Sequence, residues 1–236
     1  MIKTYRFKDL RVSYLEGFDV ARELFEDFQD GKIPKESISV LSNGTTGPVY
    51  RIEYCGQTYI LKHDLRRKHR FEFLVQSFFV GSNATRLLRK LDRAKFPFPG
   101  GAPAARIFLS ADKIRCRCVL ESFVLMEFIR GKEIYAIPDG RVAYGTSCAE
   151  IVRWLHACDL VHGDVHCGNF MVENETGRVR VIDISGKRAT AYQRAFDKIR
   201  VEEHFGVRLD EKQGFWERLV RAHLRYRAQR KLKKKK

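Results

Sequence analysis

The stretch LVHGDVHCGNFMVENETGRVRVIDISG, residues 160–186, decides the fold that we predict for this chain. It places Asp164 in a His-Gly-Asp triplet, Asn169 five residues later, and Asp183 directly after the apolar run 179–182. Enzymes that transfer a phosphoryl group from ATP use these residue types in this order, because one Asp contacts the acceptor hydroxyl while an Asn and a second Asp hold magnesium. We therefore expect Asp164 to be catalytic, and Asn169 and Asp183 to bind Mg2+.

Departures from the protein-kinase pattern favour a small-molecule acceptor over a protein substrate. Gly163 replaces the Arg of the usual His-Arg-Asp triplet, so the loop lacks a partner for an activation-loop phosphate. Ile184-Ser185 replaces the Phe-Gly that usually follows the metal-binding Asp, and no Ala-Pro-Glu motif follows. Only residues 187–236 remain after this motif, which predicts a reduced helical lobe.

Three strands are predicted in the first half of the chain, over residues 37–42, 48–54 and 58–63. Gly44 and Gly47 lie in the turn between the first two strands. Because glycine lets backbone amides approach closely, this turn either covers nucleotide phosphates or is an ordinary hairpin turn. Lys62 ends the third strand, where kinases place the Lys that pairs with nucleotide phosphates. A solvated strand edge is the alternative for Lys62.

A helix is predicted over about residues 67–91, because apolar side chains recur there at helical spacing. Glu72 is the only acidic residue of this segment before Asp92. Kinases brace their phosphate-binding Lys with a Glu from such a helix. We therefore expect Glu72 to form an ion pair with Lys62.

Two further strands, over about residues 105–111 and 117–129, follow a connector at 95–103. The second strand ends in Leu-Met-Glu-Phe-Ile, followed by a glycine. In a kinase this segment would be the hinge between the lobes, and the backbone at Glu127 and Phe128 would pair with adenine. An ordinary buried strand is the alternative.

Hydrophobic periodicity predicts the remaining elements, which are a strand-like segment over 5–15 and helices over about 18–30, 139–158, 189–205 and 211–230. A zinc site is a competing interpretation of His156, His162, His166 and Cys167. We favour magnesium, because the Asp and Asn side chains offer hard oxygen ligands and the histidines fit structural roles in loops. The pair Cys116 and Cys118 lacks a second pair at zinc-site spacing.

The charge of the chain indicates a polyanionic partner. Lys and Arg number 45 against 29 Asp and Glu, which gives a net charge of +16. Nucleic acid, anionic lipid and an anionic glycan are the classes of partner that such an excess favours. Residues 1–14 show no apolar segment of a signal peptide, and no apolar run approaches the ~18 residues of a membrane span. We therefore expect a cytoplasmic protein, in which the six scattered Cys would stay reduced.

The last segment, residues 218–236, carries ten Lys or Arg and no acidic residue. It overlaps a helical face with the apolar residues Trp216, Leu219, Val220 and Leu224. This segment is either a solvated tail or a site that docks on an anionic membrane surface. Binding of nucleic acid through it would not depend on base sequence, so no specific nucleic acid is expected as a partner.

The motifs VHGDVHCGNF, VIDISGK and AFDKIRVEEHFGV resemble the lipopolysaccharide core heptose kinases of Gram-negative bacteria, specifically the heptose(II) kinase family. The resemblance runs from the first strands, through Lys62 and FLVQSFFVG, to the basic tail, and so covers nearly the whole chain. It implies a protein-kinase-like fold and phosphorylation of an inner-core heptose that depends on ATP and magnesium. The acceptor would be the inner-core glycolipid, at the cytoplasmic face of the inner membrane.

We therefore predict an α+β, protein-kinase-like fold in a single domain, residues 1–236. A small lobe built on five strands would span about residues 1–128, and a reduced helical lobe with a basic tail would span 129–236. The predicted activity is phosphorylation of heptose II. A kinase for heptose I or Kdo is the nearest alternative, because the catalytic residues would be the same. The other alternative is a pseudokinase that binds a membrane or nucleic acid, which would need none of these catalytic residues.

Overall fold

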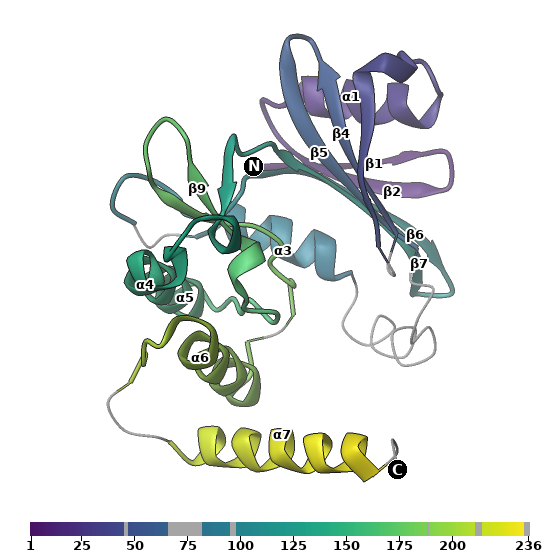
Figure 1. The fold of residues 1–236 in the computed structure, drawn as a ribbon. Coiled ribbons are helices and arrows are strands. Elements are labelled where there is room, and N and C mark those ends of the chain that lie inside the picture. Colours follow the sequence, from purple (N-terminus) through teal and green to yellow (C-terminus); the bar gives the residue numbers. More distant parts are fainter. Residues whose placement is uncertain (45–46, 66–81, 95–97, 188, 211–213, 234–236) are drawn as a thin grey trace. The chain divides into compact units, whose positions relative to one another are not determined.

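Figure 1 shows the computed structural model of the chain, which describes residues 1–44, 47–65, 82–94, 98–187, 189–210 and 214–233. The chain divides into two compact units. The first unit is Met1–Ala94 with Ala105–Ile129, and the second unit is Lys95–Ala104 with Arg130–Lys236.

Residues 98–104 belong to the second unit rather than to the small lobe predicted over about residues 1–128. The carbonyl of Pro103 accepts a hydrogen bond from the amide of Val181 at 2.8 Å, and Ala104 forms a parallel bridge with the same residue. The connector therefore joins the end of a strand in the second unit, a long-range pairing that local composition does not indicate.

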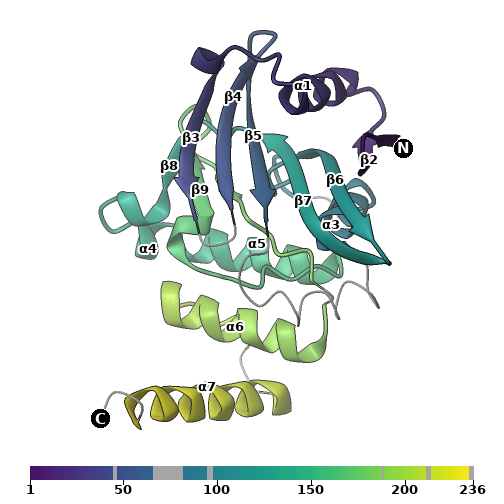
Figure 2. The same cartoon turned by 90° about the vertical axis from the view of Figure 1, so that its right-hand side faces the viewer.

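The first unit is built on one sheet of seven antiparallel strands, in the order β1-β2-β6-β7-β5-β4-β3 (Figures 1 and 2). The strands are β1 (Ile2–Phe7), β2 (Leu10–Leu15), β3 (Ile38–Asn43), β4 (Pro48–Tyr54), β5 (Gln57–Asp64), β6 (Ile107–Arg115) and β7 (Cys118–Glu127). The strands predicted as β3, β4 and β5 are confirmed to within one residue at each end. A short 3-10 turn, η1 (Lys35–Ser37), precedes β3.

Residues 5–15, predicted as one strand-like segment, fold back as a hairpin at the edge of the sheet. Lys8 has a left-handed φ of 52°, and the turn at Lys8-Asp9 sets Phe7 opposite Leu10. No glycine marks this turn, so alternation alone could not locate it. Because β2 pairs with β6, the hairpin extends the expected five-stranded sheet to seven strands.

Helix α1 (Asp19–Gln29) packs its apolar stripe against this sheet and confirms the helix predicted over 18–30. Leu24 and Phe25 are fully buried, and the ring of Phe25 meets that of Phe123 edge-on at 5.5 Å between centroids. Burying a side chain of this size stabilises a fold by about 1.5–3 kcal/mol. The stripe therefore accounts for the attachment of α1.

Helix α3 (Asn83–Asp92) begins after Ser82. The prediction of one uninterrupted helix over about residues 67–91 is therefore wrong, because the helix is interrupted at Ser82. Ser82 has extended backbone, with φ −70° and ψ 130°, and its Oγ accepts the amide of Thr85. This is an N-cap, which starts a new helix rather than continuing one. Residues 66–81 lie outside the described residues.

A buried carboxylate fastens the start of α3 to the sheet. Asp112 on β6 is 1% exposed, and its oxygens accept hydrogen bonds from the hydroxyls of Ser82, Thr85 and Ser122, each at 2.7 Å. A buried carboxylate is tolerated when donors of this kind satisfy it. The position of α3 is therefore fixed by polar contacts as well as by its apolar face.

The second unit combines a small antiparallel sheet, in the order β10-β9-β8, with helices. Its described elements are β8 (Gly131–Glu133), β9 (Phe170–Glu173), β10 (Val179–Val181), α4 (Gly140–Ala143), α5 (Gly145–Ala157), α6 (Ala191–Phe205), α7 (Phe215–Lys233) and the 3-10 turns η2 (Ile134–Ala136) and η3 (Cys167–Asn169). The helix predicted over 139–158 is divided into α4 and α5 at Tyr144.

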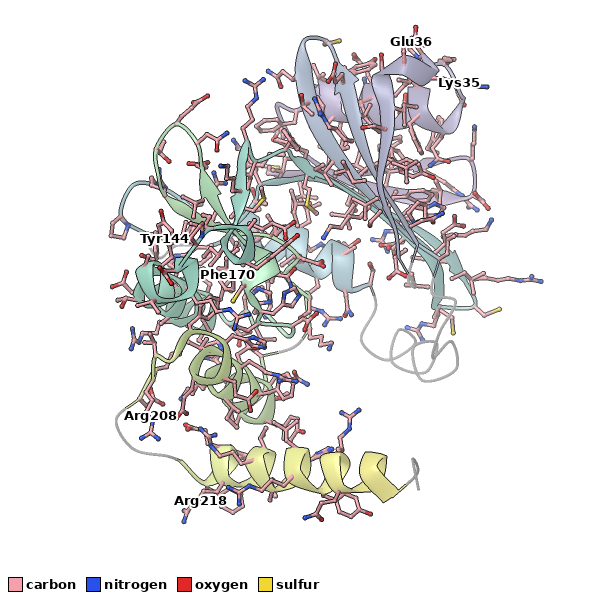
Figure 3. The ribbon with its side chains drawn as sticks, viewed as in Figure 1. Lys35, Glu36, Tyr144, Phe170, Arg208 and Arg218 are labelled. Carbon is pink, nitrogen blue, oxygen red and sulfur yellow. The ribbon has the colours of Figure 1, made fainter. Side chains whose placement is uncertain are left out.

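Helix α7 packs one face against α6 and exposes the other (Figure 1). Val220 is fully buried against α6, whereas Trp216 is 45% and Leu219 is 44% exposed. The apolar face predicted as one surface is therefore divided. One part packs against α6, and the other part is exposed to solvent. Arg218 points away from α6 (Figure 3). In the part of the chain that the structure describes, no helix combines the length and apolarity needed to cross a bilayer.

Candidate active site

The loop that carries Asp164 is anchored by a buried carboxylate on α6. Asp197 is fully buried, and its two oxygens accept the backbone amides of His162 at 2.8 Å and Gly163 at 2.9 Å. Nε2 of His156 lies 3.2 Å from the same carboxylate. Because hydrogen bonds to a charged group are stronger than neutral ones, Asp197 fixes the backbone just before Asp164.

Sequence reasoning missed Asp197. A signal was present, because Asp197, Val201 and Phe205 follow one another at i, i+4 and i+8 on α6 and all three are buried. An Asp on the apolar face of a helix needs a partner. Its partners lie 34 to 41 residues earlier in the chain, where no local pattern connects them to it.

Asn169 joins the two segments that carry the acidic site residues. Its side-chain Nδ2 donates to the backbone carbonyl of Asp164 at 2.9 Å. Its own carbonyl accepts the amide of Ile182 at 2.9 Å, immediately before Asp183. The three predicted residues Asp164, Asn169 and Asp183 are therefore brought together within the second unit.

Asp183 has left-handed backbone, with φ of 57°. This conformation costs an L residue other than glycine roughly 1–2 kcal/mol, so the surroundings must hold it. The next turn is held by the amide of Ser185, which donates to the carbonyl of His162 at 3.0 Å. The carboxylate-bearing segment is thus tied to the same loop residue that Asp197 anchors.

Gly163 is required by this close approach. It has a φ of 81°, and a Cβ at this position would lie 2.5 Å from Oγ of Ser185. Neither an Arg nor any other side chain fits residue 163 in this backbone. The Gly that replaces the usual Arg and the Ser185 that replaces the usual Gly are therefore complementary.

His166 lies next to Asp164 on the loop. Its Nδ1 accepts the amide of Gly168 at 3.1 Å, so in the neutral ring the proton is on Nε2. That Nε2 lies 3.7 Å from Oδ2 of Asp164, whose side chain is 78% exposed. The imidazole therefore faces an accessible carboxylate, as a positioning group would.

The donor set of this loop suits a hard cation. Asn169 and Asp183 offer an amide oxygen and a carboxylate, and Mg2+ is usually bound by one or two carboxylates with water and substrate phosphates. The histidines of the zinc interpretation are placed differently: His156 contacts Asp197, and His162 is buried against the ring of Phe170. Over the described residues, no three His, Cys, Asp or Glu side chains gather as a metal site.

Lys62, in the first unit, lies on an interior strand rather than at the edge of the sheet. It stands opposite Val49 of β4 on one side and Val124 of β7 on the other, and its side chain is half-buried. Lys62 therefore does not lie on an edge strand, and its role toward nucleotide phosphates stays a prediction. Glu72, its expected partner, lies outside the described residues, so their ion pair remains a prediction.

Close packing against β5 explains one of the two glycines, Gly44 and Gly47, in the turn between β3 and β4. A Cβ on Gly47 would lie 1.9 Å from the backbone carbonyl oxygen of His63, so only glycine fits against β5. A Cβ on Gly44 would meet no atom closer than 3.8 Å. The contact explains Gly47 without a nucleotide, and the phosphate role of this turn stays a prediction.

Hydrogen bonding at the end of β7 limits which backbone amide can donate to adenine. The amide of Glu127 donates to the carbonyl of Arg106 at 2.9 Å, inside the sheet. The guanidinium of Arg51 lies 5.2 Å from the ring centre of Phe128. A backbone donor to adenine would therefore have to be the amide of Phe128 or of a later residue.

The antiparallel sheet of the first unit and the helices of the second give an α+β fold, and Asp164, Asn169 and Asp183 stand in the order of a protein-kinase-like phosphotransferase. The chain belongs to the WaaY family of lipopolysaccharide core biosynthesis proteins, whose family profile matches residues 1–235.

Two relatives in Escherichia coli are both named lipopolysaccharide core heptose(II) kinase WaaY. One, from strain K12, is 30% identical over 88% of this chain and 87% of its own length. The other is 27% identical over 95% of this chain and 96% of its own length. Among solved structures, the kinase domain of maize sucrose-induced receptor kinase 1 bound to AMP-PNP matches 70% of this chain and 55% of its own, with a TM-score of 0.44 and 12% identity.

Proposed function

We propose that this protein transfers the γ-phosphoryl group of ATP to a hydroxyl of heptose II in the inner core of lipopolysaccharide. The observation that carries the proposal is the pair of hydrogen bonds through Asn169, which ties Asp164 to the segment of Asp183. The names of the two E. coli relatives support the choice of a heptose, and of heptose II in particular.

Asp164 acts on the acceptor. Its exposed carboxylate accepts the proton of the sugar hydroxyl while that oxygen bonds to the γ-phosphorus and the bond to the bridging oxygen of ADP breaks. The Nε2 of His166 lies 3.7 Å from this carboxylate. General-base catalysis of this kind contributes about 10²–10⁴-fold to a rate.

Asn169 and Asp183 would hold the magnesium ion, which neutralises charge on the phosphate oxygens when bound. The hydrogen bond from Nδ2 of Asn169 to the Asp164 carbonyl turns the amide nitrogen toward the loop, so Oδ1 is the atom left to face a cation. Lys62 and the backbone after Glu127 would bind the phosphates and the adenine of ATP. Positioning and charge neutralisation account for most of the rate in such enzymes.

The exposed face of α7 supports docking on the cytoplasmic face of the inner membrane, where a lipid-bound acceptor would be reached. Phe215, Leu219 and Tyr226 are 63%, 44% and 59% exposed, and their spacing puts them on one side of the helix. Arg218 and Arg225 flank this side and are exposed as well. Aromatic and basic residues in this arrangement suit the interface of an anionic bilayer.

Mass spectrometry of core oligosaccharide from a deletion strain tests the proposed substrate. Loss of one phosphate from heptose II, restored by the wild-type protein but not by Asp164→Ala, is the expected result. Loss from heptose I or from Kdo would mean that a different core sugar is the acceptor. Full restoration by Asp164→Ala would mean that the chain acts as a binding protein rather than as a kinase.

A further inference from the structure

A pocket of about 350 Å3 lies beside the catalytic loop, entirely within the second unit. It is lined from β8, η2, α4, the loop and α6, principally by Glu133, Tyr135, Arg141, His166, Gly168 and His204. Sites for small ligands in proteins usually occupy about 300–1,000 Å3. Apart from His166, none of these residues takes part in the phosphoryl transfer described above.

The pocket adjoins the proposed base. His166 lines the pocket, and its Nε2 lies 3.7 Å from Oδ2 of Asp164. The pocket and the carboxylate of Asp164 therefore share His166 as a neighbour.

Gly168 in the catalytic loop allows the carboxylate of Glu133 to lie close to that loop. A Cβ on Gly168 would lie 3.3 Å from Oε2 of Glu133 and 3.2 Å from the ring of His166. These distances are tighter than ordinary van der Waals contact. A Cβ at residue 168 would require Glu133 and His166 to shift by a few tenths of an ångström, so Gly168 lets the Glu133 carboxylate lie close to the loop.

The lining is balanced in charge, unlike the chain as a whole at +16. The lining contains one acidic side chain, Glu133, and one guanidinium, Arg141. Burial lowers the pKa of His204, and the neighbouring Arg200 lowers it further, so the neutral imidazole is favoured. A phosphate or carboxylate would meet the carboxylate of Glu133. Hydroxyl groups both donate and accept, so they can pair with a carboxylate, a guanidinium and an imidazole at once.

Tyr135 adds an apolar surface to this polar lining. Its side chain is on η2 and the residue is 65% exposed, so a face of the ring is open to a ligand. An aromatic ring combines a large apolar area with few rotatable bonds, and its hydroxyl can still hydrogen-bond. The C–H groups of a sugar ring fit such a face while its hydroxyls reach the charged residues.

We infer that this pocket is the acceptor subsite and binds a neutral, hydroxylated sugar residue of the glycan, next to Asp164. The inference rests on the proposed function, because it supplies the place where the acceptor of that reaction is held. It assigns Glu133 and Arg141 to the sugar hydroxyls and Tyr135 to the face of the ring.

Binding can be measured without turnover, by saturation-transfer NMR and calorimetry of the full chain with an unphosphorylated heptose disaccharide and no ATP. Glu133→Gln, Arg141→Gln and Tyr135→Ala are each expected to weaken binding at least tenfold, with unchanged melting temperature. The matched controls Lys132→Gln, on the same strand as Glu133, and Glu175→Gln, on the β9–β10 turn, are expected to bind like the wild type. Wild-type affinity in all three pocket variants would overturn the inference.

The same variants in a transfer assay are expected to raise KM for the glycan at least tenfold while KM for ATP stays unchanged. Disaccharide binding that depends on the pocket, without any transfer to a core sugar, would contradict the proposed function and leave only a sugar-binding pocket. Transfer at unchanged KM in the pocket variants would contradict the subsite and leave the proposed function standing. If binding requires a phosphate on the disaccharide, the inference that the pocket binds a neutral sugar is refuted.

Discussion

The carboxylate of Asp197 on α6 accepts the backbone amide of His162 at 2.8 Å, across 35 residues of chain. Through this contact the loop of Asp164 is held by a helix as well as by hydrogen bonds within the loop. The amide of Ser185 in turn donates to the carbonyl of His162, so the segment of Asp183 follows the same anchor. One buried side chain therefore orders both acidic residues of the candidate site.

Replacing Asp197 with Ala is expected to remove activity and to lower stability. The buried amide of His162 would be left unpaired, at a cost of about 1–3 kcal/mol, and the half-buried amide of Gly163 would lose its partner as well. Urea unfolding and a transfer assay measure the two effects. Glu203→Gln, an exposed change on the same helix, is the matched control and is expected to change neither. An active, stable Asp197→Ala variant would contradict this role.

Gly163→Ala is expected to lower both melting temperature and turnover, because a Cβ would collide with Oγ of Ser185 at 2.5 Å and the φ of 81° disfavours Ala. The φ penalty alone is roughly 1–2 kcal/mol. Adding Ser185→Gly should recover the part of the loss that comes from the collision. Calorimetry of the single and double variants checks this, and a double variant no better than Gly163→Ala would refute the complementary pair.

Acid is expected to destabilise the protein through His162. Burial lowers the pKa of this imidazole below its usual 6.5, so as pH falls through 6.5 the unfolded chain binds a proton that the folded chain does not. Stability from this residue is thus complete above pH 6.5 and decreases below it, by about 1.4 kcal/mol per pH unit at most, until the folded pKa is reached.

The matching measurement is thermal unfolding of the wild type and His162→Phe across about pH 5 to 8. The variant keeps a ring in the buried site next to Phe170 but cannot titrate. Its stability should fall less steeply than that of the wild type on the acid side. Identical slopes for both proteins would show that His162 does not cause the acid loss.

Membrane docking by α7 is expected to depend on its exposed face. Leu219→Ser and deletion of residues 231–236 should each weaken sedimentation with anionic liposomes and slow transfer to membrane-embedded acceptor. Each basic residue near an anionic bilayer contributes about 1 kcal/mol, and salt screens it within ~8 Å. Transfer to a short soluble glycan should survive. Val20→Ser, at an exposed apolar position of α1, is the control. If neither variant changes liposome binding, the exposed face of α7 does not dock on membranes.

The loop from Asp164 to Asp183 and strands β3 to β5 could be predicted because their signals are local. A triplet, an Asn at fixed spacing and an acid after an apolar run stand within residues 160–186, and alternation marks each strand. The N-cap at Ser82 is also local, yet an apolar stripe on both sides of it suggested one continuous helix.

Other features could not be predicted because their causes are distant in sequence. The attachment of residues 98–104 depends on Val181, and the role of Asp197 depends on His162 and Gly163. The division of the apolar face of α7 follows from where α6 lies, since Val220 packs on Ala195 and Ile199. Periodicity identifies an apolar face but not which part of it a neighbour covers.

Transfer from γ-labelled ATP to purified core oligosaccharide, with wild type, Asp183→Asn and Asp159→Asn, tests the central claim most directly. Asp183 and Asp159 share left-handed backbone, with φ of 57° and 55°, a conformation that Asn tolerates well. The two variants therefore make the same substitution in the same backbone, and Asp159 lies outside the candidate site, paired with Arg194. We expect magnesium-dependent transfer to be abolished in Asp183→Asn and retained in Asp159→Asn, with both proteins folded. Near-normal transfer by Asp183→Asn would contradict the account.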